Sequence, residues 1–232
     1  MNTYCIIGAS SGIGAQLTRQ LLDSGHRVLA TWHSREPSFD HPQLEWFPLN
    51  VLDELPDLSF LPDTLHGLAY CPGSINLKPF ARIKPEDFAK DYQLQVLGAV
   101  KTLQAALPAL KKADQASVVL FSTVAVQSGF NFHSLVSSSK GALEGLTRAL
   151  AAELAPKLRV NAIAPSITDT PLAATLLNTE EKKQANAQRH PLRKVGSPED
   201  IANLAEFLLS PKSGWITGQI IHADGGMSAL RV

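Results

Sequence analysis

Gly8-Ala9-Ser10-Ser11-Gly12-Ile13-Gly14 is the stretch of this 232-residue chain that decides the fold. The apolar run Thr3–Ile7 before it predicts a buried strand, and residues 13–22 after it carry a helical pattern. Glycines in such a turn allow positive φ angles and let the backbone approach a pyrophosphate closely. The first turn of the following helix offers free N–H groups and partial positive charge to an anion. The stretch therefore predicts a dinucleotide site at the end of the first strand.

Further apolar runs alternate with helical patterns along the rest of the chain. They predict strands at residues 27–32, 44–49, 65–71, 117–122, 159–163 and 219–222, and helices at 85–112, 135–154 and 198–208. A break is expected near Lys90, and Pro56 and Pro62 predict a short or broken helix between the third and fourth strands. This order predicts an α/β fold: a Rossmann-like, doubly wound parallel sheet of about seven strands with helices on both faces, in a single domain over residues 1–232.

Composition excludes several classes of function. The formal net charge is zero and the pI about 7.1, so neither nucleic acid nor a membrane surface is an expected partner. No apolar run approaches the length of a membrane span, and residues 1–7 are too short for a signal peptide. Cys5 and Cys71 lie far apart without metal-ligand spacing. We expect no metal site and two reduced thiols in a cytoplasmic protein.

Several short motifs occur in the order typical of one known family. Besides the glycine run, they are Val160-Asn161-Ala162-Ile163-Ala164-Pro165, Gly196-Ser197-Pro198-Glu199-Asp200-Ile201-Ala202, Phe207-Leu208-Leu209-Ser210, Ile216-Thr217-Gly218-Gln219 and Asp224-Gly225-Gly226. With them the chain resembles the short-chain dehydrogenase/reductase family along essentially its whole length. Ile7 stands where that family usually has threonine, and Ser166 where glycine is typical.

The resemblance implies a nicotinamide dinucleotide as cofactor. A carboxylate at the end of the second strand would favour NAD, but this chain has Trp32-His33-Ser34-Arg35 there. His33, Ser34 and Arg35 could hold a 2′-phosphate, so NADP is favoured and NAD stays open. By analogy with the family, Lys140 binds the nicotinamide ribose. The remaining implied contacts are the glycine run, Asn50, Val51, Pro72, Gly73, Ile167 and Thr170.

The same resemblance implies a catalytic group of tyrosine, serine, lysine and asparagine. Lys140 occupies the lysine position, and the family's spacing then puts Val136 in place of the tyrosine, Thr123 of the serine and Gln95 of the asparagine. A valine can neither give nor take a proton, and losing a positioned general acid typically costs ~10²–10⁴ in rate. His133 is the nearest upstream titratable side chain, and is either a replacement acid or a plain loop histidine.

Other features leave the function open. Tyr70 and Cys71 end the fourth predicted strand and either reach the substrate or lie buried, while residues 172–189 are expected to form a substrate lid by family analogy. Three functions remain: an NADP(H)-dependent oxidoreductase acting on a small carbonyl or alcohol, a nucleotide-binding pseudoenzyme or regulatory subunit without redox activity, and a non-redox lyase or isomerase. A homodimer or homotetramer is expected through the two long helices at 85–112 and 135–154, by analogy with the family.

Overall fold

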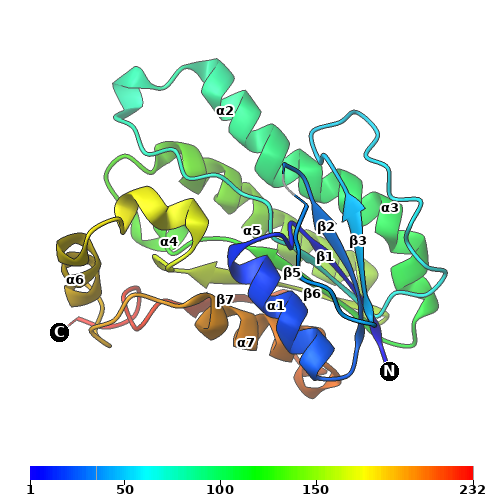
Figure 1. Cartoon of the computed structure of the whole chain (residues 1–232). Helices are drawn as coiled ribbons and strands as arrows, with labels where there is room; N and C mark the ends of the chain where they lie inside the picture. The colour runs from blue at the N-terminus through cyan, green and yellow to red at the C-terminus, as the bar shows by residue number, and fades with distance from the viewer. Residues whose placement is uncertain (35, 232) are drawn as a thin grey trace.

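A computed structural model describes residues 1–34 and 36–231 of the chain (Figure 1). Seven strands form one parallel sheet in the order β3-β2-β1-β4-β5-β6-β7. They are β1 Thr3–Ile7, β2 Arg27–Trp32, β3 Leu44–Pro48, β4 Gly67–Tyr70, β5 Ala116–Phe121, β6 Leu158–Pro165 and β7 Ile220–Ala223. The order reverses between β1 and β4, which opens a crevice at their carboxyl ends. The predicted α/β fold is confirmed.

Helices cover both faces of the sheet (Figure 1). Successive strand residues point to opposite sides, and apolar residues on both sides need to be buried. Tyr4 and Ile6 of β1 pack into the core under α1 (Gly12–Asp23) and α7 (Pro198–Leu209). Cys5 and Ile7 pack into the other core, under α3 (Gly98–Lys112) and α5 (Ser134–Leu154). The shorter elements are η1 Phe80–Arg82, α2 Pro85–Tyr92, η2 Gln93–Leu97, α4 Ala125–Ser128, η3 Pro171–Leu176, α6 Glu180–Gln188 and η4 Pro211–Ser213.

The link between β3 and β4 corrects one expectation. No helix forms in residues 49–66, all of which the structure describes. Proline lacks the N–H that a helix interior needs, and the Asp57 carboxylate accepts the backbone N–H of Ser59 at 3.0 Å in a local turn. The link is held instead by single apolar anchors: Leu58 is buried, and the Phe60 ring stacks on Phe47 with centroids 4.1 Å apart. Two prolines therefore remove the helix rather than shorten it.

The second correction concerns the expected break near Lys90. The helical axis continues through that residue, and the irregularity is the π-helical turn η2. The N–H of Gly98 bonds to the carbonyl of Gln93 rather than that of Leu94. The Leu94 carbonyl accepts the buried hydroxyl of Tyr70 at 2.6 Å. A tertiary hydrogen bond from β4 thus takes over one carbonyl of the helical ladder, which is a recognised cause of such turns.

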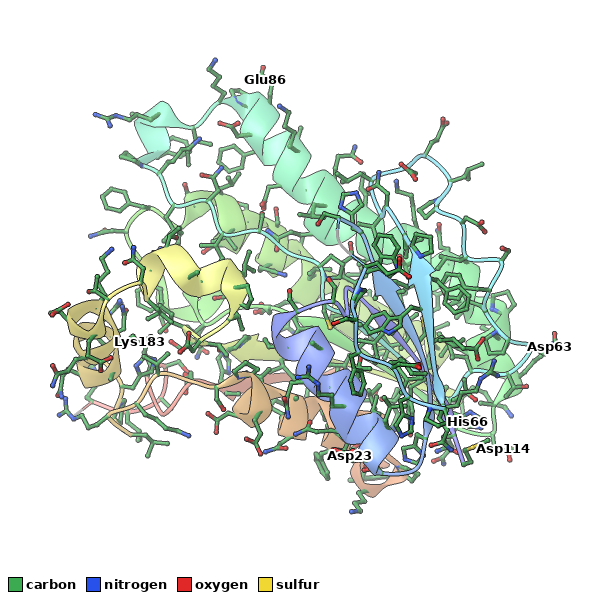
Figure 2. All side chains as sticks on the ribbon, in the orientation of Figure 1. Asp23, Asp63, His66, Glu86, Asp114 and Lys183 are labelled. Atoms are coloured by element: carbon green, nitrogen blue, oxygen red, sulfur yellow. The ribbon has the colours of Figure 1, made fainter. Side chains whose placement is uncertain are left out.

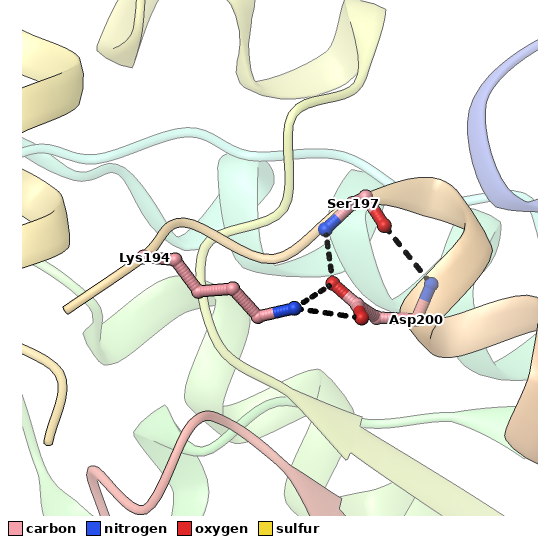
Figure 3. Close-up of polar contacts among 3 residues, drawn as sticks. All are labelled: Lys194, Ser197 and Asp200. Carbon is pink, nitrogen blue, oxygen red and sulfur yellow. Dashed lines mark hydrogen bonds and ion pairs between the residues drawn. The ribbon is translucent and has the colours of Figure 1, made fainter. Parts of the chain in front are cut away.

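The start of α7 is defined by a capping box (Figure 3). The Ser197 hydroxyl accepts the N–H of Asp200 at 3.1 Å, and the Asp200 carboxylate accepts the N–H of Ser197 at 2.9 Å. Lys194 adds an ion pair to the same carboxylate at 2.9 Å. Reciprocal caps of this kind satisfy two end groups of a helix. They fix the residue at which α7 begins, and this helix packs beside α1.

Candidate cofactor and active site

Two clefts meet at the carboxyl ends of the strands. One, of about 310 Å³, lies under η3 and α6, and the other, of about 360 Å³, lies over the glycine turn. Both are lined by Ile13, Cys71, Gly73, Thr170 and Leu172. The shared residues make them one groove with two ends, large enough for a long ligand that enters both.

The glycine turn has the geometry that its sequence predicts. Gly8 and Gly12 have φ values of +76° and +55°, and the N–H of Gly8 is held by the Thr31 hydroxyl at 3.0 Å. A Cβ at Gly14 would overlap the carbonyl oxygen of Gly8, and one at Gly12 would lie 3.3 Å from Cγ2 of Thr170. The three glycines therefore keep α1 close to β1 and leave the space in front of its first turn free.

The residues present fit a pyrophosphate. Ser10, Ser11, Gly12, Ile13 and Gly14 all line the second cleft. Ser11 precedes α1 with an extended backbone, and its side chain makes no capping hydrogen bond within the described chain. The N–H groups of the first helical turn therefore meet no hydroxyl cap from Ser11, and their partial positive charge suits an anion.

The end of the second cleft that lies away from the first cleft, near His33 and Ser34, carries no carboxylate among its described lining residues. His33 and Ser34 are exposed there beyond the end of β2, and Arg35 lies outside the described residues. Val51 forms a buried wall, with Pro72 and Gly73 across the cleft. The Asn50 amide is already engaged, donating to Asp53 at 2.6 Å and accepting the N–H of Leu52 at 3.1 Å. Asn50 therefore shapes this end of the cleft by ordering its own turn.

Lys140 lies in the first cleft, close to where the two clefts meet. Its side chain comes from α5 and is buried, and burial lowers the pKa of its ammonium to about 8, opposed by the Asp91 carboxylate and by Cys71. Its Nζ lies 3.6 Å from the position that a Cβ on Gly73 would take, and so does Oε1 of Gln95. A buried ammonium whose pKa lies this close to neutral pH needs polar neighbours to keep its charge, and Asp91 and Gln95 supply them.

Asp91 belongs to this group although the sequence analysis did not select it. Its buried carboxylate accepts Nε2 of Gln95 at 2.7 Å and the hydroxyl of Ser74. Gln95 is fully buried on the π-turn, and its Oε1 has no partner among the described residues. The orphaned oxygen is an acceptor that a bridging water suits. The i, i+4 spacing of Asp91 and Gln95 was the available signal.

Three of the predicted catalytic positions line the first cleft with Lys140. The Thr123 hydroxyl accepts the N–H of Ala125 at 3.3 Å, which leaves its own proton to donate. Val136 lies one helical turn before Lys140 and is buried at the wall. His133 precedes α5, with Nδ1 2.8 Å from the carbonyl of Asn131. Gln95 lines the same cleft, so the fold brings all four of these positions together with Lys140.

No tyrosine is among the residues lining the first cleft in the described chain. Tyr4 and Tyr70 are buried in the cores and Tyr92 is exposed on α2. Burial raises the pKa of the Tyr70 hydroxyl above its ordinary value, and its proton goes to the Leu94 carbonyl. Cys71 lines both clefts, and burial raises the pKa of its thiol to about 12. Of the two neighbours, Cys71 rather than Tyr70 can touch a ligand.

The predicted lid, residues 172–189, closes one side of the first cleft. Leu172, Ala173 and Leu176 of η3 line it, as do Ile167 and Thr170 from the loop after β6. Figure 2 shows Lys183 on α6, the lid helix, and its ammonium pairs with the Asp169 carboxylate at 2.8 Å. The Glu180–Lys182 side of α6 is exposed, as expected for its charged sequence. The lid is therefore an apolar wall whose outer face is charged.

Two classes of site are not found in the part of the chain that the structure describes. None of its helices combines the length and the apolar content that a membrane crossing requires. Its His, Cys, Asp and Glu side chains form no group of three that could hold a metal ion.

Comparisons with known proteins identify the family of the chain. A family model described as enoyl-(acyl carrier protein) reductase matches residues 59–228. A tropinone reductase homolog of Arabidopsis thaliana is 36% identical over 240 residues, covering 96% of this chain and 91% of the relative. A 3-oxoacyl-[acyl-carrier-protein] reductase of Aquifex aeolicus is 30% identical, covering 96% and 95%. The structure of ElxO with NADP bound has a TM-score of 0.89 at 26% identity, covering 99% of both chains. The chain belongs to the short-chain dehydrogenase/reductase family.

Proposed function

We propose that this chain is a single dinucleotide-binding domain that acts in the cytoplasm as an NADP(H)-dependent oxidoreductase on a small carbonyl or alcohol. The observation that carries the proposal is the continuous groove, in which the phosphate-binding turn and the Lys140 ammonium lie at opposite sides of the Gly73 junction. Solved relatives include one with NADP bound and 99% coverage of this chain. The apolar lining of the first cleft suits an uncharged substrate.

The residues that would hold the cofactor follow the groove. The glycine turn and the start of α1 take the pyrophosphate, and His33, Ser34 and Arg35 take a 2′-phosphate. Asn50, Val51 and Pro72 surround the adenine end, while Gly73, Lys140, Ile167 and Thr170 surround the nicotinamide end. When bound, a nicotinamide dinucleotide supplies or accepts the hydride.

The chain's own residues then act on the substrate oxygen. Thr123 donates its free proton as a hydrogen bond to that oxygen, which orients it. Lys140 donates to the ribose hydroxyls and adds positive charge. Gln95 holds a water beside Lys140 through its orphaned Oε1. The proposed tetrad therefore has no titratable side chain at the acid position, where Val136 stands. Its other members are Gln95, Thr123 and Lys140.

Cofactor choice gives the first prediction. Ser34→Asp places a carboxylate where NADPH carries its 2′-phosphate, so its Kd is expected to rise roughly 10–100-fold, the equivalent of one charge-assisted hydrogen bond. NADH lacks that phosphate and its Kd is expected to change by less than about threefold. Nucleotide fluorescence titration measures both. Ser34→Asn is the neutral control of equal size, and an equal loss in both variants would mean that charge at this position does not select the cofactor.

Lys140 gives a prediction about pH. The ammonium is charged below its pKa of about 8 and neutral above it, so donation to the ribose weakens as the pH rises. The Kd for NADPH is expected to increase toward about tenfold per pH unit above pH 8. Lys140→Met is expected to bind roughly 10–100-fold more weakly at pH 7, with no such pH dependence between 7 and 9.5. The same slope in both proteins would assign the titration to another group.

A nucleotide-binding protein without redox activity is the second candidate, because no tyrosine lines the described cleft. The experiment that separates them is NADPH binding followed by reduction of 4-nitrobenzaldehyde. Binding with turnover supports the oxidoreductase. Binding without turnover of this or any other carbonyl supports a pseudoenzyme or regulatory subunit. Failure to bind either dinucleotide contradicts both and leaves a lyase or isomerase.

A homodimer or homotetramer is part of the proposal. An apolar groove of about 160 Å³ lies between α3 and α5, lined by Leu103, Leu107, Leu146 and Leu150 among others. In the isolated chain Leu107, Leu146 and Leu150 are only partly buried. A second copy would cover this groove, which light scattering can test.

A further inference from the structure

We propose that Ser166 and His190 form the proton-transfer pair of the first cleft, in place of the missing phenol. The Ser166 hydroxyl donates its proton to the substrate oxygen. His190 orients that hydroxyl and gives it a new proton. The inference rests on the proposed carbonyl/alcohol chemistry and names the residues that complete it. Ser166 lines the first cleft, and His190 lies directly behind it with 2% of its surface exposed.

Two hydrogen bonds set the protonation of the neutral imidazole. Nδ1 lies 2.8 Å from the carbonyl oxygen of Asn186, and a carbonyl only accepts, so Nδ1 carries the ring proton. Nε2 is then the acceptor, and it lies 2.8 Å from Oγ of Ser166. The serine hydroxyl therefore donates to the ring. Its only other polar neighbour among the described residues is the weakly accepting sulfur of Met227 at 3.4 Å.

The histidine is held so that it cannot turn away. Its backbone N–H bonds to the carbonyl of Ala187 at 3.0 Å, and its carbonyl accepts the N–H of Arg193 at 2.9 Å. Gly225, with a φ of +61°, passes close to the ring: a Cβ there would lie 3.4 Å from Cβ and 3.6 Å from Cδ2 of His190. The Gly225 backbone therefore packs against the imidazole. Such support from neighbouring elements is what a precise proton-transfer geometry requires.

The sheet brings Ser166 next to the other polar groups of the cleft. Ser166 follows β6 and Thr123 follows β5, and these strands are neighbours with Phe121 paired to Ile163. The N–H of Val124 bonds to the carbonyl of Pro165 at 3.1 Å, which continues the pairing past the strand ends. Thr123 and Ser166 therefore lie on adjacent strand ends, and both line the cleft with Lys140. A substrate oxygen held by Thr123 lies on the side of the cleft that Ser166 occupies.

In the direction of reduction, the substrate oxygen receives its proton from Ser166. As the carbonyl carbon becomes an alcohol carbon, its oxygen takes the proton of the Ser166 hydroxyl, so that one O–H bond breaks and another forms. The serine oxygen regains a proton from the Nε2–H of a protonated His190. Water in the cleft then returns that proton to His190 through the Ser166 hydroxyl, which lines the cleft. Oxidation of an alcohol runs the same transfers backwards, with His190 as the base.

A hydrogen bond between Ser166 and His190 could also serve only to hold α6 against the end of β6. The two roles differ in what they change. A hydrogen bond that only holds α6 in place affects stability and lid closure, and therefore KM and nucleotide affinity. A proton-transfer pair affects kcat and leaves those constants nearly alone.

The test measures reduction of 4-nitrobenzaldehyde by NADPH in wild type, Ser166→Ala and Ser166→Thr. Ser166→Ala is expected to lower kcat about 10²–10⁴-fold, while KM and the NADPH Kd stay within about threefold, as for a group that acts in the transition state. Ser166→Thr keeps the hydroxyl and is expected to retain most of the activity. Ser138→Ala, which removes an exposed hydroxyl bonded to the Ser134 carbonyl, is the matched control and is expected to match wild type.

A second measurement does not depend on turnover. In ¹⁵N NMR of the nucleotide-free protein, His190 is expected to show a proton on Nδ1, and the Nε2 shift is expected to move in Ser166→Ala. If that variant is unstable, Ser166→Gly removes the same hydroxyl and serves instead. Wild-type kcat in either hydroxyl-free variant overturns the inference while leaving the proposed function intact, as does loss confined to KM. Wild type that binds NADPH but reduces no carbonyl also overturns it, and failure to bind NADPH overturns the proposed function first.

Discussion

In a chain that already carries Ser166→Ala, adding Val136→Tyr is expected to raise kcat for carbonyl reduction about 10²–10⁴-fold, the usual contribution of a positioned general acid. Val136 lines the first cleft and lies four residues before Lys140 on α5, so the two side chains share one face of the helix. The lysine ammonium would favour the ionised phenol and lower its pKa. The Ser166→Ala background removes the competing hydroxyl, so the gain reports the phenol alone.

Val136→Phe in the same background is the control, since it adds the ring without the hydroxyl. Both variants fill the same part of the cleft and are expected to change KM similarly. A difference in kcat therefore measures proton donation, and solvent deuterium should slow the tyrosine variant more. Equal kcat in the two variants would contradict the assignment of Val136 to the acid position.

Gly14→Ala is expected to abolish useful nucleotide binding. The added Cβ would overlap the Gly8 carbonyl oxygen and lie 3.1 Å from Cα of Ala9, and both are backbone atoms that cannot rotate away. α1 must then shift away from β1, and misplacement of about 1 Å can cost ~10²-fold. The same overpacking is expected to lower the free energy of unfolding by roughly 1–3 kcal/mol. Fluorescence titration with NADPH and thermal unfolding measure the two effects.

Gly145→Ala is the matched control for that substitution. Gly145 lies inside α5, where a Cβ would meet nothing within 4 Å. Alanine costs less backbone entropy than glycine in a helix, so this variant is expected to be more stable by about 0.5–1 kcal/mol with unchanged nucleotide affinity. Loss of affinity in Gly145→Ala, or its retention in Gly14→Ala, would contradict the close-packing role of the glycine turn.

Much of the fold could be predicted because its signals are local. The seven apolar runs and the glycine turn each act through neighbouring residues, and their bounds agree with the observed strands within a few residues. The capping box at Ser197 is a signal of the same kind. The missing helix before β4 follows from local signals too, Pro56 and Pro62, whose effect is stronger than expected. The π-turn was not local, because it depends on a hydroxyl from β4.

Some residues of the candidate site could be selected from the sequence, and others could not. The family resemblance selected Val136, Thr123 and Gln95 as the counterparts of its catalytic residues. His190 could not be found, since it is 24 residues from Ser166 and no periodic pattern links them. The serine in a position typical of glycine was a visible signal, but its meaning required the partner.

The sequence by itself determined the order of strands and helices along the chain and the glycine turn between β1 and α1, because these depend on residues that are neighbours along the chain. The tertiary structure alone decided which distant groups share the cleft. The carbonyl of Leu94 is bonded by Tyr70, the carboxylate of Asp91 by Ser74, and the hydroxyl of Ser166 by His190. Each of these contacts joins segments that only the packing of helices and loops around the parallel sheet brings within reach.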